Sequence, residues 1–237
     1  MLKINGLSAA YGEAQVLHEV SLDVNAGEVV ALLGRNGMGK TSLVRTVMGL
    51  GSPQKTSGDI TMGGVSLEGF PPYKISQMGV GYVPQGRRLF ASLTVLEHLS
   101  VLDKGDKVGA KGAWTIEEVF KVFPRLKERI HHKGNQLSGG ERQMLAIGRS
   151  LMIGPSVLLM DEPTEGLDPV MVGLVEDILK KLKQSGLGIL LVEQNLYSAL
   201  DVADRVFIME TGQLVWSGLP SELLNNEDTL HKYLGVH

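Results

Sequence analysis

The chain has 237 residues, of which 43% are hydrophobic and 21% charged, with a formal net charge of −3. This length can bury a sizeable core, and the absence of a global basic field excludes nucleic acid as an expected partner. The chain has no cysteine, which excludes disulfides and thiolate metal sites, and it has no run near the roughly 20 apolar residues of a membrane span.

The first predicted elements are short strands. Residues 2–9 and 19–24 read as strands that are more exposed than those of the core and form an antiparallel flap, and residues 58–62 read as a further strand of it. Between them, Val29–Leu33 is apolar throughout, which is typical of a buried strand. A glycine-rich loop follows, and a helix is predicted over residues 40–48.

The spacing of apolar residues changes between about residues 86 and 155, where short apolar runs give way to apolar residues spaced three or four apart, as in helices. Helices are predicted over residues 95–102, 116–123 and 138–153, with a flexible loop at 105–112. We interpret residues 87–154 as a helical subdomain inserted into an α/β core.

Buried strands return after the insert, at residues 157–160, 189–192 and 206–209. A helix is predicted at 170–183, and the tail at 221–234 is also expected to be helical. Alternation of buried strands with helices predicts an α/β fold with a mainly parallel sheet. Residues 1–86 and 155–237 form its core and flap.

The loop after the first buried strand, GRNGMGKT, fits the pattern G-x-x-x-x-G-K-[ST]. Glycines let successive backbone N–H groups point at phosphate oxygens, and the helix N-terminus adds its positive end. The lysine can reach the β- and γ-phosphates, and the threonine hydroxyl can bind Mg²⁺. The candidate nucleotide-binding residues here are Gly34, Asn36, Gly37, Gly39, Lys40, Thr41 and Ser42.

Two acids, Asp161 and Glu162, end the buried strand SVLLM. Ligands of open α/β sheets bind at the carboxyl ends of strands. Asp161 is suited to hold Mg²⁺, through water, and Glu162 to polarise an attacking water. A solvated acidic loop is the alternative, and the phosphate loop upstream favours the functional interpretation.

The segment LSGGE precedes a long predicted helix. Ser138 and Glu141 fit a capping box, but Gly139 and Gly140 would weaken an ordinary first turn. A glycine-rich helix N-terminus is also a second phosphate-binding device. One chain is not expected to bring both devices to one phosphate, so a head-to-tail pair of chains is predicted.

These three segments together resemble the motifs of the ABC ATPase family, and the resemblance covers nearly the whole chain. It implies a single domain over residues 1–237 with a P-loop NTPase core, an antiparallel flap and a helical subdomain that carries the LSGGE signature. It also implies ATP and Mg²⁺ as cofactors and ATP hydrolysis as the activity.

The resemblance implies roles for isolated residues too. Tyr11 stands where the family stacks an aromatic ring on adenine, although a plain strand tyrosine is the alternative. Gln85, in YVPQG, matches the glutamine that senses Mg²⁺ and the membrane partner. The loop ending at Asp168 resembles the one that meets the second subunit. Arg87 and Arg88, beside Gln85, are either a surface pair or a contact with the membrane partner.

One position departs from the family pattern. The family usually has a histidine after the last core strand, in contact with the γ-phosphate, and ILLVEQN has Gln194 there. A glutamine amide can donate a hydrogen bond but carries no positive charge. Hydrolysis is still expected because Glu162 remains. The expected catalytic residues are thus Glu162, Gln194 and Gln85, and the expected metal ligands are Thr41, Gln85 and Asp161.

The segments VPQGRRLF, RQMLAIGRSLM, LLVEQN and a terminal YLG resemble the subgroup that serves branched-chain amino acid uptake, whose near relatives serve urea or short amides. This implies a peripheral subunit on the cytoplasmic face of the membrane, with permease subunits, a second ABC ATPase in a homo- or heterodimer, and a periplasmic-type binding protein. The alternatives are an exporter motor, a soluble ABC ATPase of DNA repair, translation or cofactor assembly, and a non-catalytic ATP binder.

Overall fold

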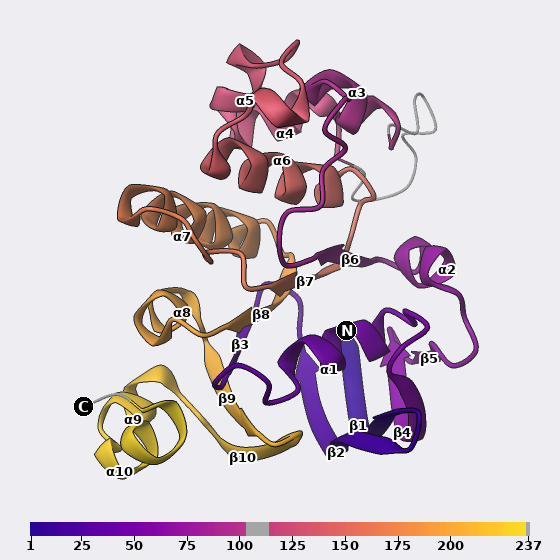
Figure 1. Cartoon of the computed structure of the whole chain (residues 1–237), viewed down its shortest axis with the longest axis vertical. Coiled ribbons are helices and arrows are strands. Elements are labelled where there is room, and N and C mark those ends of the chain that lie inside the picture. Colours follow the sequence, from indigo (N-terminus) through magenta and orange to yellow (C-terminus); the bar gives the residue numbers. More distant parts are fainter. Residues whose placement is uncertain (103–113, 236–237) are drawn as a thin grey trace.

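The computed structural model describes residues 1–102 and 114–235, so the predicted loop at 105–112 lies outside the described residues. The flap is a four-stranded antiparallel sheet in the order β2-β1-β4-β5 (Figure 1). Its strands are β1 (Leu2–Tyr11), β2 (Ala14–Val24), β4 (Gln54–Met62) and β5 (Val65–Ser66). They extend the three predicted flap strands and add a fourth.

The second sheet has six strands in the order β10-β9-β3-β8-β7-β6, all parallel except β10. Every residue of β3, β7 and β8 is buried, as expected of parallel strands covered on both faces. The predicted α/β fold with a mainly parallel sheet is confirmed. The strands are β3 (Val29–Leu33), β6 (Val80–Val83), β7 (Val157–Asp161), β8 (Gly188–Glu193), β9 (Arg205–Glu210) and β10 (Gln213–Gly218).

Strand β3 supplies side chains to two hydrophobic cores. Val29, Ala31 and Leu33 belong to the core that also contains helical residues from α4, α6 and α7. Val30 and Leu32 belong to the other core, together with residues of the flap and of α1. This alternation follows from the two-residue period of a strand.

Helices cover both faces of the six-stranded sheet, and α3 to α6 gather at the top of Figure 1, away from the flap. No helix in residues 1–102 and 114–235 is long and apolar enough to cross a membrane. The helices are α1 (Lys40–Val47), α2 (Pro72–Gln77), α3 (Val95–Ser100), α4 (Ile116–Val122), α5 (Pro124–Glu128), α6 (Gly139–Leu151), α7 (Pro169–Gln184), α8 (Leu196–Val202), α9 (Pro220–Leu224) and α10 (Glu227–Thr229), with a π-helical turn at Leu230–Leu234.

The structure adds elements that the sequence pattern did not predict, namely β6, β10, α2, α5 and α8. In β6, Gly81 weakens the strand pattern, yet a Cβ there would lie 2.9 Å from Leu158 Cδ1 and 3.0 Å from Cβ of the rigid Pro155 ring, so close packing favours the glycine. The tail is helical in separate pieces rather than continuously, because Asn226 caps a new helix through the Thr229 N–H.

Candidate nucleotide site

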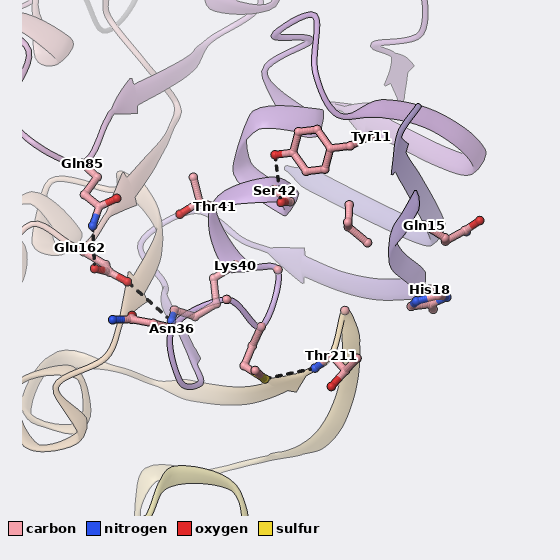
Figure 2. A pocket seen from close by; sticks show the side chains of 15 residues that line it. Tyr11, Gln15, His18, Asn36, Lys40, Thr41, Ser42, Gln85, Glu162 and Thr211 are labelled. Carbon is pink, nitrogen blue, oxygen red and sulfur yellow. Dashed lines mark hydrogen bonds and ion pairs between the residues drawn. The ribbon is translucent and has the colours of Figure 1, made fainter. Parts of the chain in front are cut away.

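A cleft of about 500 Å³ lies between the flap and the phosphate loop (Figure 2). Both sheets contribute to it, and the backbone N–H of His18 in β2 donates to the Gly212 carbonyl beyond β9, at 2.9 Å. The residues that line the cleft are Tyr11, Gln15, Val16, His18, Asn36, Gly37, Met38, Gly39, Lys40, Thr41, Ser42, Gln85, Glu162, Thr211 and Gly212.

Two motif glycines are required by the path of the phosphate loop. Gly39 caps α1 in the left-handed region, at φ 105°, and a Cβ there would lie 3.1 Å from the Val16 carbonyl oxygen. A Cβ on Gly34 would lie 2.4 Å from the Met209 carbonyl oxygen. Side chains at either position would push the loop away from the flap or from β9.

The Lys40 ammonium is buried at the base of this loop. Its Nζ donates to the Gly34 carbonyl at 2.6 Å and to the Arg35 carbonyl at 3.1 Å, and lies 3.6 Å from Glu162 Oε1. Burial lowers the pKa of Lys40, and the carboxylates of Glu162 and Asp161 oppose that shift. The ammonium is thus held by weak backbone acceptors and one carboxylate, which a nucleotide phosphate could replace.

Asp161 ends β7 beside the helix that follows the phosphate loop. Thr41 Oγ1 donates to Asp161 Oδ1 at 3.1 Å, while Asp161 Oδ2 is buried and has no hydrogen-bond partner among the described residues. Burial raises the pKa of Asp161 to about 6. A buried carboxylate oxygen without a partner, beside a hydroxyl, suits a hard cation such as Mg²⁺.

Glu162 and Gln85 meet at the side of the cleft. Glu162 has a left-handed backbone, at φ 49°, a conformation that costs a non-glycine residue of order 1–3 kcal/mol and is often found at functional sites. Its N–H donates to the Val192 carbonyl at 2.9 Å, which anchors the turn to β8. Gln85 Nε2 donates to Glu162 Oε2 at 3.0 Å.

Tyr11 lies on the flap side, where its hydroxyl and that of Ser42 are 3.2 Å apart. Its ring is partly exposed and faces the cleft, a geometry that suits stacking on a base (Figure 2). Gln15, His18 and Thr211 line the same end of the cleft, and no motif in the sequence identified them. They come from β2 and from the turn after β9, and only the contact between the two sheets brings them there.

The LSGGE segment lies outside this cleft. Ser138 caps α6: its hydroxyl accepts from the Glu141 N–H at 3.2 Å, and Glu141 Oε2 accepts from the Ser138 N–H at 2.9 Å, so the capping box is present. Ser138 and Gly139 are exposed, whereas Gly140 is buried. The two glycines therefore have different surroundings.

We expect Gly140→Ala to melt at a lower temperature than Gly139→Ala, because the new methyl group displaces the Met171 side chain. The difference should be small, since that side chain is flexible and only partly buried and both variants gain up to about 1 kcal/mol of helix propensity. A Cβ on Gly140 would lie 2.2 Å from Met171 Cε, 2.8 Å from Sδ and 3.0 Å from Cγ, so the whole Met171 side chain would have to move. Thermal melting of the nucleotide-free protein measures the change.

The neighbouring glycine supplies the matched control. A Cβ on Gly139 would meet only Arg87 Nη2, at 4.0 Å, so Gly139→Ala should leave the melting temperature unchanged or raise it. Met171→Ala should reduce the loss caused by Gly140→Ala in the double variant. Equal melting temperatures for Gly139→Ala and Gly140→Ala would contradict the packing argument.

The remaining candidates, Asp168 and Gln194, lie at the ends of other elements and are not among the residues that line the cleft. Asp168 caps α7 by accepting from the Met171 N–H at 3.0 Å. Gln194 follows β8, is exposed and is not among the residues that line the cleft. Its neighbour Glu193, which the sequence analysis missed, is buried and accepts from the Thr164 N–H and hydroxyl at 3.0 and 2.7 Å. Burial raises the pKa of Glu193.

Comparison with known proteins agrees with this geometry. A family model described as ABC transporter matches residues 17–165. The high-affinity branched-chain amino acid transport ATP-binding protein BraG of Pseudomonas aeruginosa is 42% identical over 239 residues, covering 99% of this chain and 100% of BraG. The lipopolysaccharide export system ATP-binding protein LptB of Haemophilus influenzae is 35% identical over 237 residues, covering 99% and 97% of the two chains.

A solved structure extends the comparison to the nucleotide. The dimeric post-hydrolysis state of the ATP-binding cassette MJ0796, bound to ADP and Pi, has a TM-score of 0.77 and 25% identity to this chain, and the match covers 93% of this chain and 99% of that one. The family model spans more than half of the chain, and both relatives match nearly all of it. The chain therefore belongs to the ABC transporter family and is an ATP-binding and ATP-hydrolysing cassette.

Proposed function

We propose that the chain hydrolyses MgATP in the cleft of Figure 2 and that this hydrolysis drives uptake through membrane-spanning permease subunits. The observation that carries the proposal is one cleft in which Lys40, Thr41, Gln85 and Glu162 converge, with Asp161 hydrogen-bonded to Thr41. These groups supply a phosphate-binding cation, oxygen ligands for a metal and a carboxylate that can orient water.

Each residue has a distinct role in this proposal. Lys40 and the N–H groups of the loop bind the β- and γ-phosphates. Thr41, Asp161 and Gln85 hold Mg²⁺, which neutralises charge on the phosphate oxygens when bound. Glu162 accepts a hydrogen bond from the attacking water and orients it, and Gln194 contributes a neutral amide donor.

The second subunit of the dimer is another ATP-binding cassette, either a copy of this chain or a close relative. Ser138 and Gly139 are exposed at the N-terminus of α6, a helix of 13 residues whose first N–H groups can bind an anion. They are not part of this chain's own cleft. In the head-to-tail pair, this end of α6 closes the nucleotide of the partner.

A surface beside Gln85 suits the permease subunits. Phe90 is 63% exposed. Its backbone is fixed by one hydrogen bond, in which the Phe90 N–H donates to Nε2 of buried His98 at 3.0 Å. A single exposed apolar side chain is ordinary on a protein surface, so the docking site is assigned from the resemblance at Gln85, and Phe90 is assigned to it only as a residue five positions further along the chain. We therefore propose that the helical subdomain, residues 87–154, docks peripherally on the permease from the cytoplasmic face of the membrane.

The substrate class is inferred from the relatives. Identity to BraG, whose name gives branched-chain amino acid transport, exceeds identity to LptB, whose name gives lipopolysaccharide export. We therefore propose branched-chain amino acid uptake, with urea or short amides as the related importer substrates. Export is the second candidate, supported by the full-length match to LptB.

The test is a tagged pull-down from native membranes in mild detergent, with mass spectrometry of the partners. Polytopic proteins together with a periplasmic-type binding protein are expected, and that binding protein would bind leucine, isoleucine or valine in a calorimetric screen that includes urea and amides. Polytopic partners without a binding protein would favour the exporter. Soluble partners alone would contradict transport while leaving the ATPase intact.

A further inference from the structure

The orientation of the Gln85 amide is fixed by two carboxylates. Gln85 Nε2 lies 3.0 Å from Glu162 Oε2 and 3.0 Å from Glu165 Oε2. A primary amide has two N–H groups, and each carboxylate can only accept, so both donors of Gln85 are used. The amide oxygen is consequently turned away from the two acids, toward the side of the cleft on which Thr41 lies (Figure 2).

Glu165 lies on a turn that is anchored on several sides. Its N–H donates to the Glu162 carbonyl at 3.2 Å, and its own carbonyl accepts from Arg87 Nη2 at 2.9 Å. The preceding residue, Thr164, is tied to buried Glu193 through both its N–H and its hydroxyl. The backbone of Glu165 is therefore held in place by hydrogen bonds, although its side chain is exposed.

We propose that Glu165 is a positioning residue that presents the Gln85 amide oxygen to the metal ion of bound MgATP. The inference rests on the proposed function, in which Gln85 is a metal ligand. One carboxylate alone leaves the amide free to rotate about a single hydrogen bond. The second carboxylate fixes the amide plane, so that the oxygen faces Thr41 before the metal arrives.

The experiment measures metal affinity directly rather than turnover. Mn²⁺ is titrated into the full-length protein saturated with a non-hydrolysable ATP analogue, and free Mn²⁺ is followed by electron paramagnetic resonance. Loss of one charge-assisted hydrogen bond at an exposed position should weaken Mn²⁺ binding in Glu165→Ala by roughly five- to tenfold. Glu165→Gln keeps an oxygen that accepts the same bond and should stay within about twofold of wild type.

Three controls separate positioning from folding and from the metal assignment. Glu117→Ala removes an exposed glutamate of α4 and should leave Mn²⁺ affinity unchanged. Affinity for the nucleotide analogue in the presence of EDTA should be the same in all variants, and melting temperatures report folding. Combining Gln85→Ala with Glu165→Ala should weaken Mn²⁺ binding no further than Gln85→Ala alone, since Glu165 acts through Gln85.

The outcomes distinguish this inference from the proposed function. Unchanged or tighter Mn²⁺ binding in Glu165→Ala, with weaker binding in Gln85→Ala, would overturn the positioning role and leave Gln85 as the ligand. Tighter binding in particular would mean that Glu165 holds the amide away from the metal. Unchanged binding in Gln85→Ala would remove Gln85 from the metal site and overturn both assignments.

Discussion

Glu162→Gln is expected to lower the rate of ATP hydrolysis by about 100-fold or more while leaving ATP binding intact. A carboxylate that orients and deprotonates water contributes on the order of 10²- to 10⁴-fold to a rate, and an amide cannot take the proton. The substitution keeps the hydrogen bond at one end of the side chain, because a glutamine oxygen can still accept from Gln85 Nε2, while the amide NH2 replaces the carboxylate oxygen 3.6 Å from Lys40 Nζ and removes that ion pair. Phosphate release measures turnover, and a fluorescent ATP analogue measures binding.

The same variant tests the pairing of two cassettes. A Glu162→Gln protein that binds but does not cleave ATP should accumulate as an ATP-dependent dimer, alone or with a close relative, in size-exclusion chromatography. Glu117→Gln, on the exposed face of α4, is the control and should turn over normally. Monomers at every ATP concentration, with either partner, would contradict the head-to-tail arrangement.

Lys40→Ala is expected to weaken ATP binding by roughly 100-fold, within the range for lost hydrogen bonds to a charged group. In the nucleotide-free protein Lys40 is 3% exposed, and its ammonium is held by the Gly34 and Arg35 carbonyls. A phosphate would provide a stronger, charged acceptor at the same place. Calorimetric titration with ATP measures the affinity, and turnover should fall with it at any fixed ATP concentration below saturation.

Two further variants test whether the loss of ATP affinity is due to the Lys40 ammonium itself. Lys40→Arg keeps the charge, but its larger planar guanidinium does not fit the compact cage of the two carbonyls, so binding should also be weak. Lys74→Ala removes an exposed lysine of α2 and should bind ATP like the wild type. Wild-type affinity in Lys40→Ala would show that this side chain does not contact the phosphates.

Much of the core was predictable because its strands are buried on both faces. Val29–Leu33 reads as an unbroken apolar run, and the structure gives β3 the same bounds. The capping box of Ser138 and Glu141 was readable for a similar reason, since its bonds join residues three positions apart. Local patterns of this kind need no knowledge of the rest of the fold.

The missed features depend on contacts between distant segments. Edge strand β10 has a half-exposed pattern, and its place is decided by pairing with β9. Gly140 packs against Met171, a residue of another helix, whereas Gly139 does not. The LSGGE sequence alone therefore could not show that its two glycines differ in packing. Likewise, Glu165 meets Gln85 only because β6 and β7 are neighbours in the sheet.

The division of β3 between two cores has a mechanical consequence. The strand is hydrogen-bonded to β8 on one side and to β9 on the other, and its five side chains alternate between the core under the flap and the core under the helices. Such a strand cannot bend or slide without disturbing both cores at once. We therefore expect movement at the phosphate loop to be taken up in the turn before Val29 and in the glycine loop after Leu33 rather than within β3.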